Sequence, residues 1–189
     1  MSASSLAGPG LGFSMSLILG INNHVLRNHL AEITKPADAA ELKAQVQQMV
    51  NLALTHPHTV TLHEENIPGR PRFNCYQYSF GIADVRVREG ILEFFPGSAF
   101  AQFLVEHHLE EIGSGDVKDG DHILYSGVQI GHAGRVQSGT IESKWGTGHI
   151  WRHGVYEVPD NYGDTVHFYR HFSRESVLQA LHEVGFQTS

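Results

Sequence analysis

Cys75 is the only cysteine among the 189 residues, and it stands where a helix is expected to begin. Asn74 favours the N-cap position, and Gln77 follows three residues later, where a capping box places glutamate or glutamine. A thiol in a first helical turn faces the positive end of the dipole and unpaired backbone N–H groups, which favour the thiolate. Cys75 is therefore a candidate nucleophile. The alternative is a cysteine that only packs, since free cysteine is among the most buried residue types.

A cysteine nucleophile needs a proton partner, and His132 lies 57 residues downstream in a segment of strand character. As an imidazolium it would raise the thiolate fraction and then protonate the leaving amine. A third group should accept the other ring N–H. Glu142 is the first choice because a carboxylate is the strongest group for orienting an imidazole. The sequence does not assign which face of this strand points toward His132, so Ser143, on the opposite face, is the second choice. The alternative for His132 is a half-buried strand histidine bonded to a backbone carbonyl.

Five further residues are candidates for binding a substrate. Asn74, Tyr76 and Gln77 flank the nucleophile and could add side-chain contacts, while its own backbone N–H would supply one oxyanion donor. Trp145 and Trp151 surround a glycine-rich loop and could wall a cleft. The alternative for the two tryptophans is that they fill the face of a sheet.

Neither a cofactor nor a metal is expected. A single cysteine excludes an intramolecular disulfide framework and cysteine-rich zinc sites. The pairs His149/His153 and His167/His171 would have metal-ligand spacing on a helix, but neither carries the glutamate of a His-Glu-x-x-His motif, and the second pair falls in a predicted strand.

The composition indicates one globular domain that binds no nucleic acid. Apolar residues make up 41% of the chain, and the net charge of −7 leaves no basic stripe to neutralise phosphates. The N-terminus lacks the cationic region of a signal peptide, and the apolar run 13–21 is too short to span a membrane. A cytosolic protein is expected, or one exported without a cleavable signal.

Hydrophobic periodicity predicts an α+β fold, with helices first, then an antiparallel sheet covered on one side by helices, and finally a C-terminal helix. Residues 1–12 are expected to be flexible, 13–70 to form a helical extension and 71–189 to form the catalytic part of one compact domain. The predicted helices cover about 22–33, 36–55, 75–82, 99–112 and 174–184. The predicted strands cover about 59–63, 122–125, 128–137, 140–145 and 166–172, and 84–97 is expected to be a connector.

Three segments together resemble the NlpC-type group of papain-like cysteine peptidases and amidases. They are Asn74-Cys75 at a helix start, the run Asp116 to Tyr125 leading into a strand, and Gly131 to Val136 around the histidine. The resemblance covers about residues 70–172 and implies a papain-like fold with Cys75 and His132 as the catalytic pair. The chain has Asn-Cys-Tyr-Gln where the family usually has Asp-Cys-Ser-Gly.

The expected function is therefore that of a hydrolase, a thiol protease or amidase that cleaves a peptide or amide bond through a thioester. The resemblance implies peptidoglycan peptides as substrate. Two alternatives stay open. One is an acyltransferase or transpeptidase that uses the same cysteine and histidine, and the other is a non-catalytic binding module in which Cys75 is buried.

Overall fold

The computed structural model describes residues 17–20, 22–35, 39–66, 73–89, 91–146 and 148–189. The segment 1–12, which was expected to be flexible, lies outside these residues, as do the loop 67–72 and the predicted helix start at Pro36.

Two N-terminal helices form where the periodicity predicts them, α1 (His24–Ile33) and α2 (Ala39–Ala53). Asn23 caps α1, and its side chain accepts hydrogen bonds from the first-turn N–H groups. Each helix buries one apolar stripe, and the stripes include Leu26, Leu30, Met49 and Leu52. In the described part of the chain, no helix is long and apolar enough to cross a lipid bilayer.

The described residues form one large antiparallel sheet of seven strands, in the order β1-β8-β7-β6-β5-β9-β4. The three central neighbours β5, β6 and β7 are sequential, as their alternating pattern and glycine turns predict. Two strands of this sheet were not predicted, namely β4 and β8, and β8 contains part of the His149–His153 segment. The bounds are β1 (Thr61–Glu64), β4 (Glu111–Ile112), β5 (His122–Ser126), β6 (Ile130–Gln137), β7 (Thr140–Lys144), β8 (Ile150–His153) and β9 (Thr165–Tyr169).

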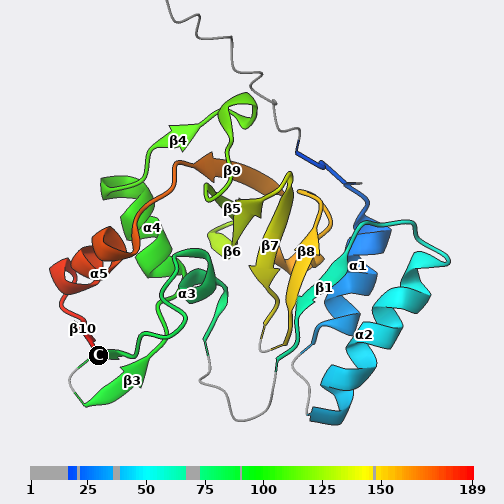
Figure 1. Ribbon diagram of the computed structural model, residues 1–189, viewed down its shortest axis with the longest axis horizontal. Coiled ribbons are helices and arrows are strands. Elements are labelled where there is room, and N and C mark those ends of the chain that lie inside the picture. Colours follow the sequence, from blue (N-terminus) through cyan, green and yellow to red (C-terminus); the bar gives the residue numbers. More distant parts are fainter. Residues whose placement is uncertain (1–16, 21, 36–38, 67–72, 90, 147) are drawn as a thin grey trace, which may run out of the picture.

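Helices cover both faces of this sheet, so the expectation of cover on one side only is wrong. In Figure 1, α1 and α2 lie together on one side and the other helices, α3 (Cys75–Ser79), α4 (Ser98–His107) and α5 (Arg174–Glu183), on the other. Alternation along β5 explains the two cores. Ile123 and Tyr125 pack toward α1 and α2, whereas Leu124 packs toward α3, α4 and α5.

Two other boundaries differ from the predictions. The helix predicted to reach residue 112 ends at His107, and Glu111 and Ile112 pair with β9 as β4. The predicted connector 84–97 contains a hairpin of β2 (Val87–Glu89) and β3 (Leu92–Phe94), which β10 (Gln187–Thr188) extends to a small sheet. The pairings of β4 with β9 and of β10 with β2 join distant segments, and local periodicity carries no signal for them.

Candidate functional site

The start of α3 has the predicted capping box. The Asn74 side chain accepts a hydrogen bond of 2.9 Å from the Gln77 N–H, and the Gln77 side chain accepts one of 3.3 Å from the Asn74 N–H. Cys75 is therefore the first residue of the helix. Because α3 has only five residues, its dipole is weak, and the surroundings of the sulfur decide its chemistry.

The sulfur of Cys75 lies against β6 where β6 and β7 separate. The β6–β7 ladder pairs Arg135 with Glu142 and continues only toward the hairpin turn, so Ala133 has no partner on β7. The Ala133 N–H instead faces the Cys75 sulfur, together with the N–H groups of Tyr76 and of Cys75 itself. Ala133 directly follows His132, so the fold brings the cysteine to the backbone of the predicted histidine.

His132 is buried, with 1% of its surface exposed. Its ring stacks on that of Tyr162 with a centroid distance of 3.9 Å and an interplanar angle of 12°, and the Tyr125 ring lies 5.7 Å away. Its Nε2 atom is buried and has no hydrogen-bond partner among the described residues. An imidazole nitrogen in this state is free to accept a proton from a group that reaches it.

Burial leaves both members of the pair uncharged at neutral pH. Loss of solvent raises the pKa of the Cys75 thiol to about 11, although the facing N–H groups and Lys144 oppose this effect. Loss of solvent also holds the pKa of His132 well below its ordinary value. The expectation of a thiolate at the helix start is therefore wrong for this conformation, because desolvation outweighs the helix terminus.

Lys144 is a neighbour of the nucleophile that the sequence analysis missed. It is 3% exposed, its Nζ donates a 2.6 Å hydrogen bond to the Gly148 carbonyl, and Nζ lies 4.7 Å from the centre of the Phe73 ring. Burial lowers its pKa to about 8, while Glu64 and Cys75 favour the charged form. Its place two residues after Glu142, on the same face of β7, was the only local signal.

The two residues predicted to orient His132 are bound elsewhere, and this part of the expectation is corrected. Glu142 accepts hydrogen bonds from the Tyr78 hydroxyl at 3.2 Å and from Arg152 at 2.5 Å, on the face toward α3. Ser143 faces the other core, where its hydroxyl bonds to His153 Nε2 at 2.8 Å. Glu142 is paired with Arg135, three residues along β6 from His132, and Ser143 is bound to His153, so neither forms a hydrogen bond to the imidazole.

The predicted substrate-binding residues are also used internally. Trp145 and Trp151 are 0% and 1% exposed and pack 5.7 Å apart in the core, so they wall no cleft. Tyr76 donates to the Ile130 carbonyl, and Gln77 to that of Val85. The Asn74 amide donates to the Pro96 carbonyl, so the three residues around Cys75 anchor α3 rather than face a ligand.

The histidines whose spacing would suit metal ligands on a helix form hydrogen bonds within the protein. His149 Nδ1 accepts from the Asn66 N–H and its Nε2 donates to the Leu42 carbonyl. His153 Nδ1 donates to the Gly154 carbonyl. His167 bonds to Glu111, and His171 lies past the end of β9, so the predicted strand face is broken between them.

Acid is expected to destabilise the fold through its buried histidines. Burial lowers the pKa of His122 to about 3 and of His153 to about 4, and His132 is shifted the same way. Below the unfolded value near 6.5 the unfolded chain binds protons that the native state does not, so stability is present above that pH and is lost as pH falls toward 4. Each such group contributes a slope of about 1.4 kcal/mol per pH unit.

Urea unfolding across this pH range measures how the free energy of unfolding changes with pH. His153→Gln should lower this slope by about one proton. An unfolding free energy that does not vary with pH between neutral and about pH 5 would contradict buried, neutral histidines.

Comparison with protein-family models, with curated proteins and with solved structures found no match for this chain.

Proposed function

We propose that the chain is a cysteine hydrolase of papain-like type that cleaves an amide bond through a thioester on Cys75. The observation that supports this most strongly is the contact between the Cys75 sulfur and the N–H of Ala133, the residue after His132. The thiol and the imidazole thereby meet at the same point of β6 from opposite faces of the sheet. Cys75 packs with Leu124 and Ala133, whereas His132 pairs with Tyr125 on the other face, and its Nε2 has no hydrogen-bond partner among the described residues.

The reaction would begin from a neutral pair. As the sulfur attacks the substrate carbonyl, His132 takes the thiol proton. The N–H groups around the sulfur, together with Lys144, stabilise the negative charge on the sulfur as the proton leaves. The C–N bond then breaks, and the imidazolium gives its proton to the leaving amine. Water, deprotonated by the same imidazole, hydrolyses the thioester and restores the thiol.

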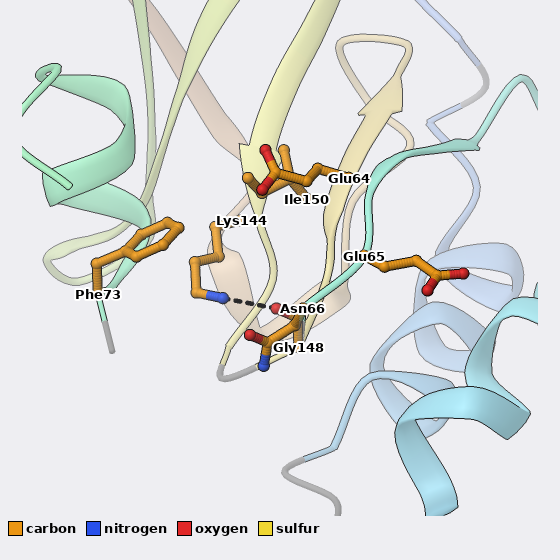
Figure 2. Close-up of a pocket in the computed structure, with 7 residues that line it drawn as sticks. All are labelled: Glu64, Glu65, Asn66, Phe73, Lys144, Gly148 and Ile150. Carbon is orange, nitrogen blue, oxygen red and sulfur yellow. Dashed lines mark hydrogen bonds between the residues drawn. The ribbon is translucent and has the colours of Figure 1, made fainter. Parts of the chain in front are cut away.

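A small hollow lies next to Lys144. Its cavity volume is about 10 Å³, and Figure 2 shows Phe73 and Lys144 on one side and the segment of Glu64, Glu65 and Asn66 on the other. Gly148 and Ile150 complete the lining. Because a cavity needs about 10–15 Å³ to hold one water molecule, this hollow admits a water only, and a substrate group would have to displace its walls to reach Lys144.

Acylation by an activated ester tests the proposal without knowledge of the natural substrate. Wild-type protein mixed with p-nitrophenyl acetate should release nitrophenolate in a burst and carry one acetyl group on Cys75, located by mass spectrometry. His132→Gln should lose the burst, whereas His122→Gln, which alters an equally buried histidine, should keep it. Acetylation at lysines alone, or equal rates in the two variants, would reject the proposal.

A non-catalytic binding module is the second candidate. The observation that favours it is the burial of the thiol, which raises the pKa of Cys75 to about 11 and slows attack on any electrophile. In that case Cys75 should acylate no faster than a free thiol peptide at the same pH, and only unfolding should make it react.

A further inference from the structure

Tyr162 is the residue whose ring stacks on the histidine of the proposed catalytic pair. It ends η2 (Asp160–Tyr162), the turn between β8 and β9, and its ring lies flat on the His132 imidazole. The Gly146 N–H faces its phenol oxygen, and a negative charge on Cys75 would be felt there. A residue that follows Cys75 by almost half of the chain is therefore packed flat against the imidazole.

The backbone around Tyr162 has little freedom to move. A β-carbon on Gly131, the neighbour of His132, would lie 2.6 Å from the Tyr162 carbonyl oxygen, so only glycine permits this approach. On the other side, Gly163 has a φ of 111° and sits against the Ser126 backbone. The turn is thus fitted closely against the β5–β6 hairpin.

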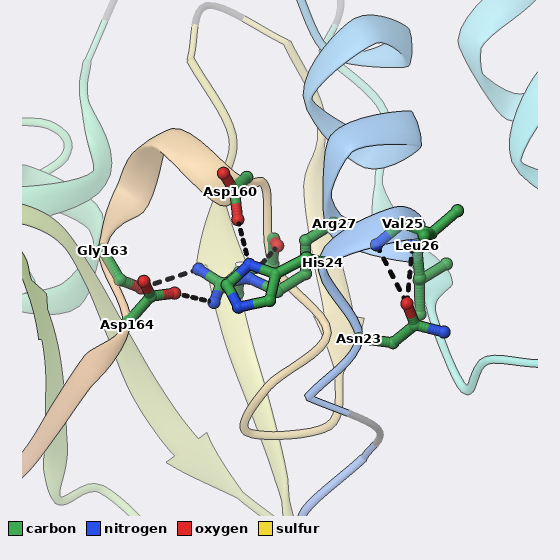
Figure 3. A network of polar contacts seen from close by, with 9 residues as sticks. Asn23, His24, Val25, Leu26, Arg27, Asp160, Gly163 and Asp164 are labelled. Carbon is green, nitrogen blue, oxygen red and sulfur yellow. Dashed lines mark hydrogen bonds and ion pairs between the residues drawn. The ribbon is translucent and has the colours of Figure 1, made fainter.

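A buried arginine from α1 holds the same turn. Figure 3 shows Arg27 reaching Gly163 and Asp164; its Nη2 donates to the Gly163 carbonyl at 2.7 Å, and its Nη1 pairs with Asp164. Its Nε donates to the Val158 carbonyl at 3.1 Å. Arg27 is 1% exposed, so its guanidinium is held by the two backbone carbonyls inside the protein, whereas the Asp164 side chain is 61% exposed and closes the site from the solvent side.

We propose that Tyr162 is a positioning residue that fixes the His132 imidazole for proton transfer with Cys75, and that α1 belongs to the catalytic unit because Arg27 sets Tyr162. This inference rests on the proposed hydrolase function. Stacking restricts the imidazole to one plane, and neither Glu142 nor Ser143 is bonded to it. Tyr162 therefore takes the orienting role for which the sequence offered those two residues.

Two substitutions at Tyr162 separate the ring from its hydroxyl. Tyr162→Phe keeps the stacked ring, and its burst rate with p-nitrophenyl acetate should stay within about threefold of wild type. Tyr162→Leu removes the ring, and misplacement of the imidazole should slow the burst by about 10²-fold. Tyr156→Leu, a tyrosine that packs at the same core without touching His132, controls for loss of packing and should keep the rate.

The His132 ring protons give a readout that does not depend on catalysis. The stacked tyrosine shifts their NMR signals upfield, and this shift should persist in Tyr162→Phe and vanish in Tyr162→Leu. If wild type shows the shift but no burst, the hydrolase function fails while the stacking stands. If wild type shows a burst that Tyr162→Leu leaves intact, or that Tyr162→Phe abolishes as fully as leucine does, the positioning role is overturned.

Gly131→Ala tests the placement of the turn with Tyr162 still present. Its β-carbon must push the Tyr162 carbonyl away, so the burst and the upfield shift should both diminish. Gly127→Ala, on the same β5–β6 hairpin, meets no atom within 4 Å and should change neither. A Gly131→Ala protein that remains folded with the wild-type burst and shift would refute the proposal.

Discussion

Replacing Cys75 with alanine is expected to abolish the nitrophenolate burst, with a loss of roughly 10³-fold or more, and to leave the protein folded. Among the described residues Cys75 is the only thiol, so no other group can form the thioester. The capping box of α3 is made by Asn74 and Gln77 and does not use the Cys75 side chain, and alanine is a better helix former than cysteine.

Chemical denaturation provides the control for this variant. Cys75→Ala should retain a cooperative transition within about 1–2 kcal/mol of wild type, the cost of a small half-buried group. A variant that keeps the burst would show that another nucleophile reacts. A variant that loses cooperative unfolding would show that Cys75 is a packing residue, as the binding-module candidate requires.

Gly163→Ala is expected to cause the largest loss of stability of any single methyl addition considered, roughly 2–4 kcal/mol. A β-carbon there would lie about 2.4 Å from the Ser126 carbonyl carbon, a distance that forces the backbone to move. The φ of 111° adds conformational strain for any residue with a side chain. The shift should also disturb the Arg27 hydrogen bond to the Gly163 carbonyl.

Gly185→Ala separates the steric contact of the added methyl group from the conformational strain of a positive φ. Gly185 has a φ of 88° after α5, but its β-carbon would meet no atom within 4 Å. It should therefore show only the conformational cost of about 1–2 kcal/mol. If the two variants have equal midpoints in thermal unfolding, the contact between Gly163 and the β5–β6 hairpin contributes nothing to stability.

The sequence was sufficient to predict the elements whose capping and turn hydrogen bonds join residues close together in the chain. The reciprocal bonds of Asn74 and Gln77 involve residues three apart, so the start of α3 follows from adjacent sequence alone. The same holds for Ser173, whose side chain caps α5 by accepting a hydrogen bond from the N–H of Ser176, and for the sequential strands β5, β6 and β7, whose turns and alternation are short-range. The α+β class followed from the order of these elements.

Long-range pairing decided what periodicity could not. Glu111 and Ile112 form a strand because β9 offers them a partner, and helix propensity there is too small to compete. Trp145 and Trp151 became core residues because α1 and α2 cover the second face of the sheet, which the chain order did not reveal. An aromatic side chain near a glycine-rich loop suits a cleft and a core equally well until its neighbours are known.

The chemistry of the site divides in the same way. Residue type and order were enough to select Cys75 and His132 as candidates, because few side chains can act as nucleophile and base. The charge state of the thiol, the neighbouring Lys144, and the contacts of Tyr162 and Arg27 were decided only by the tertiary structure. The physical reason is that a pKa, a ring stack and a buried hydrogen bond depend on desolvation and on distances through space, and residues 27, 75, 132 and 162 have no local relation along the chain.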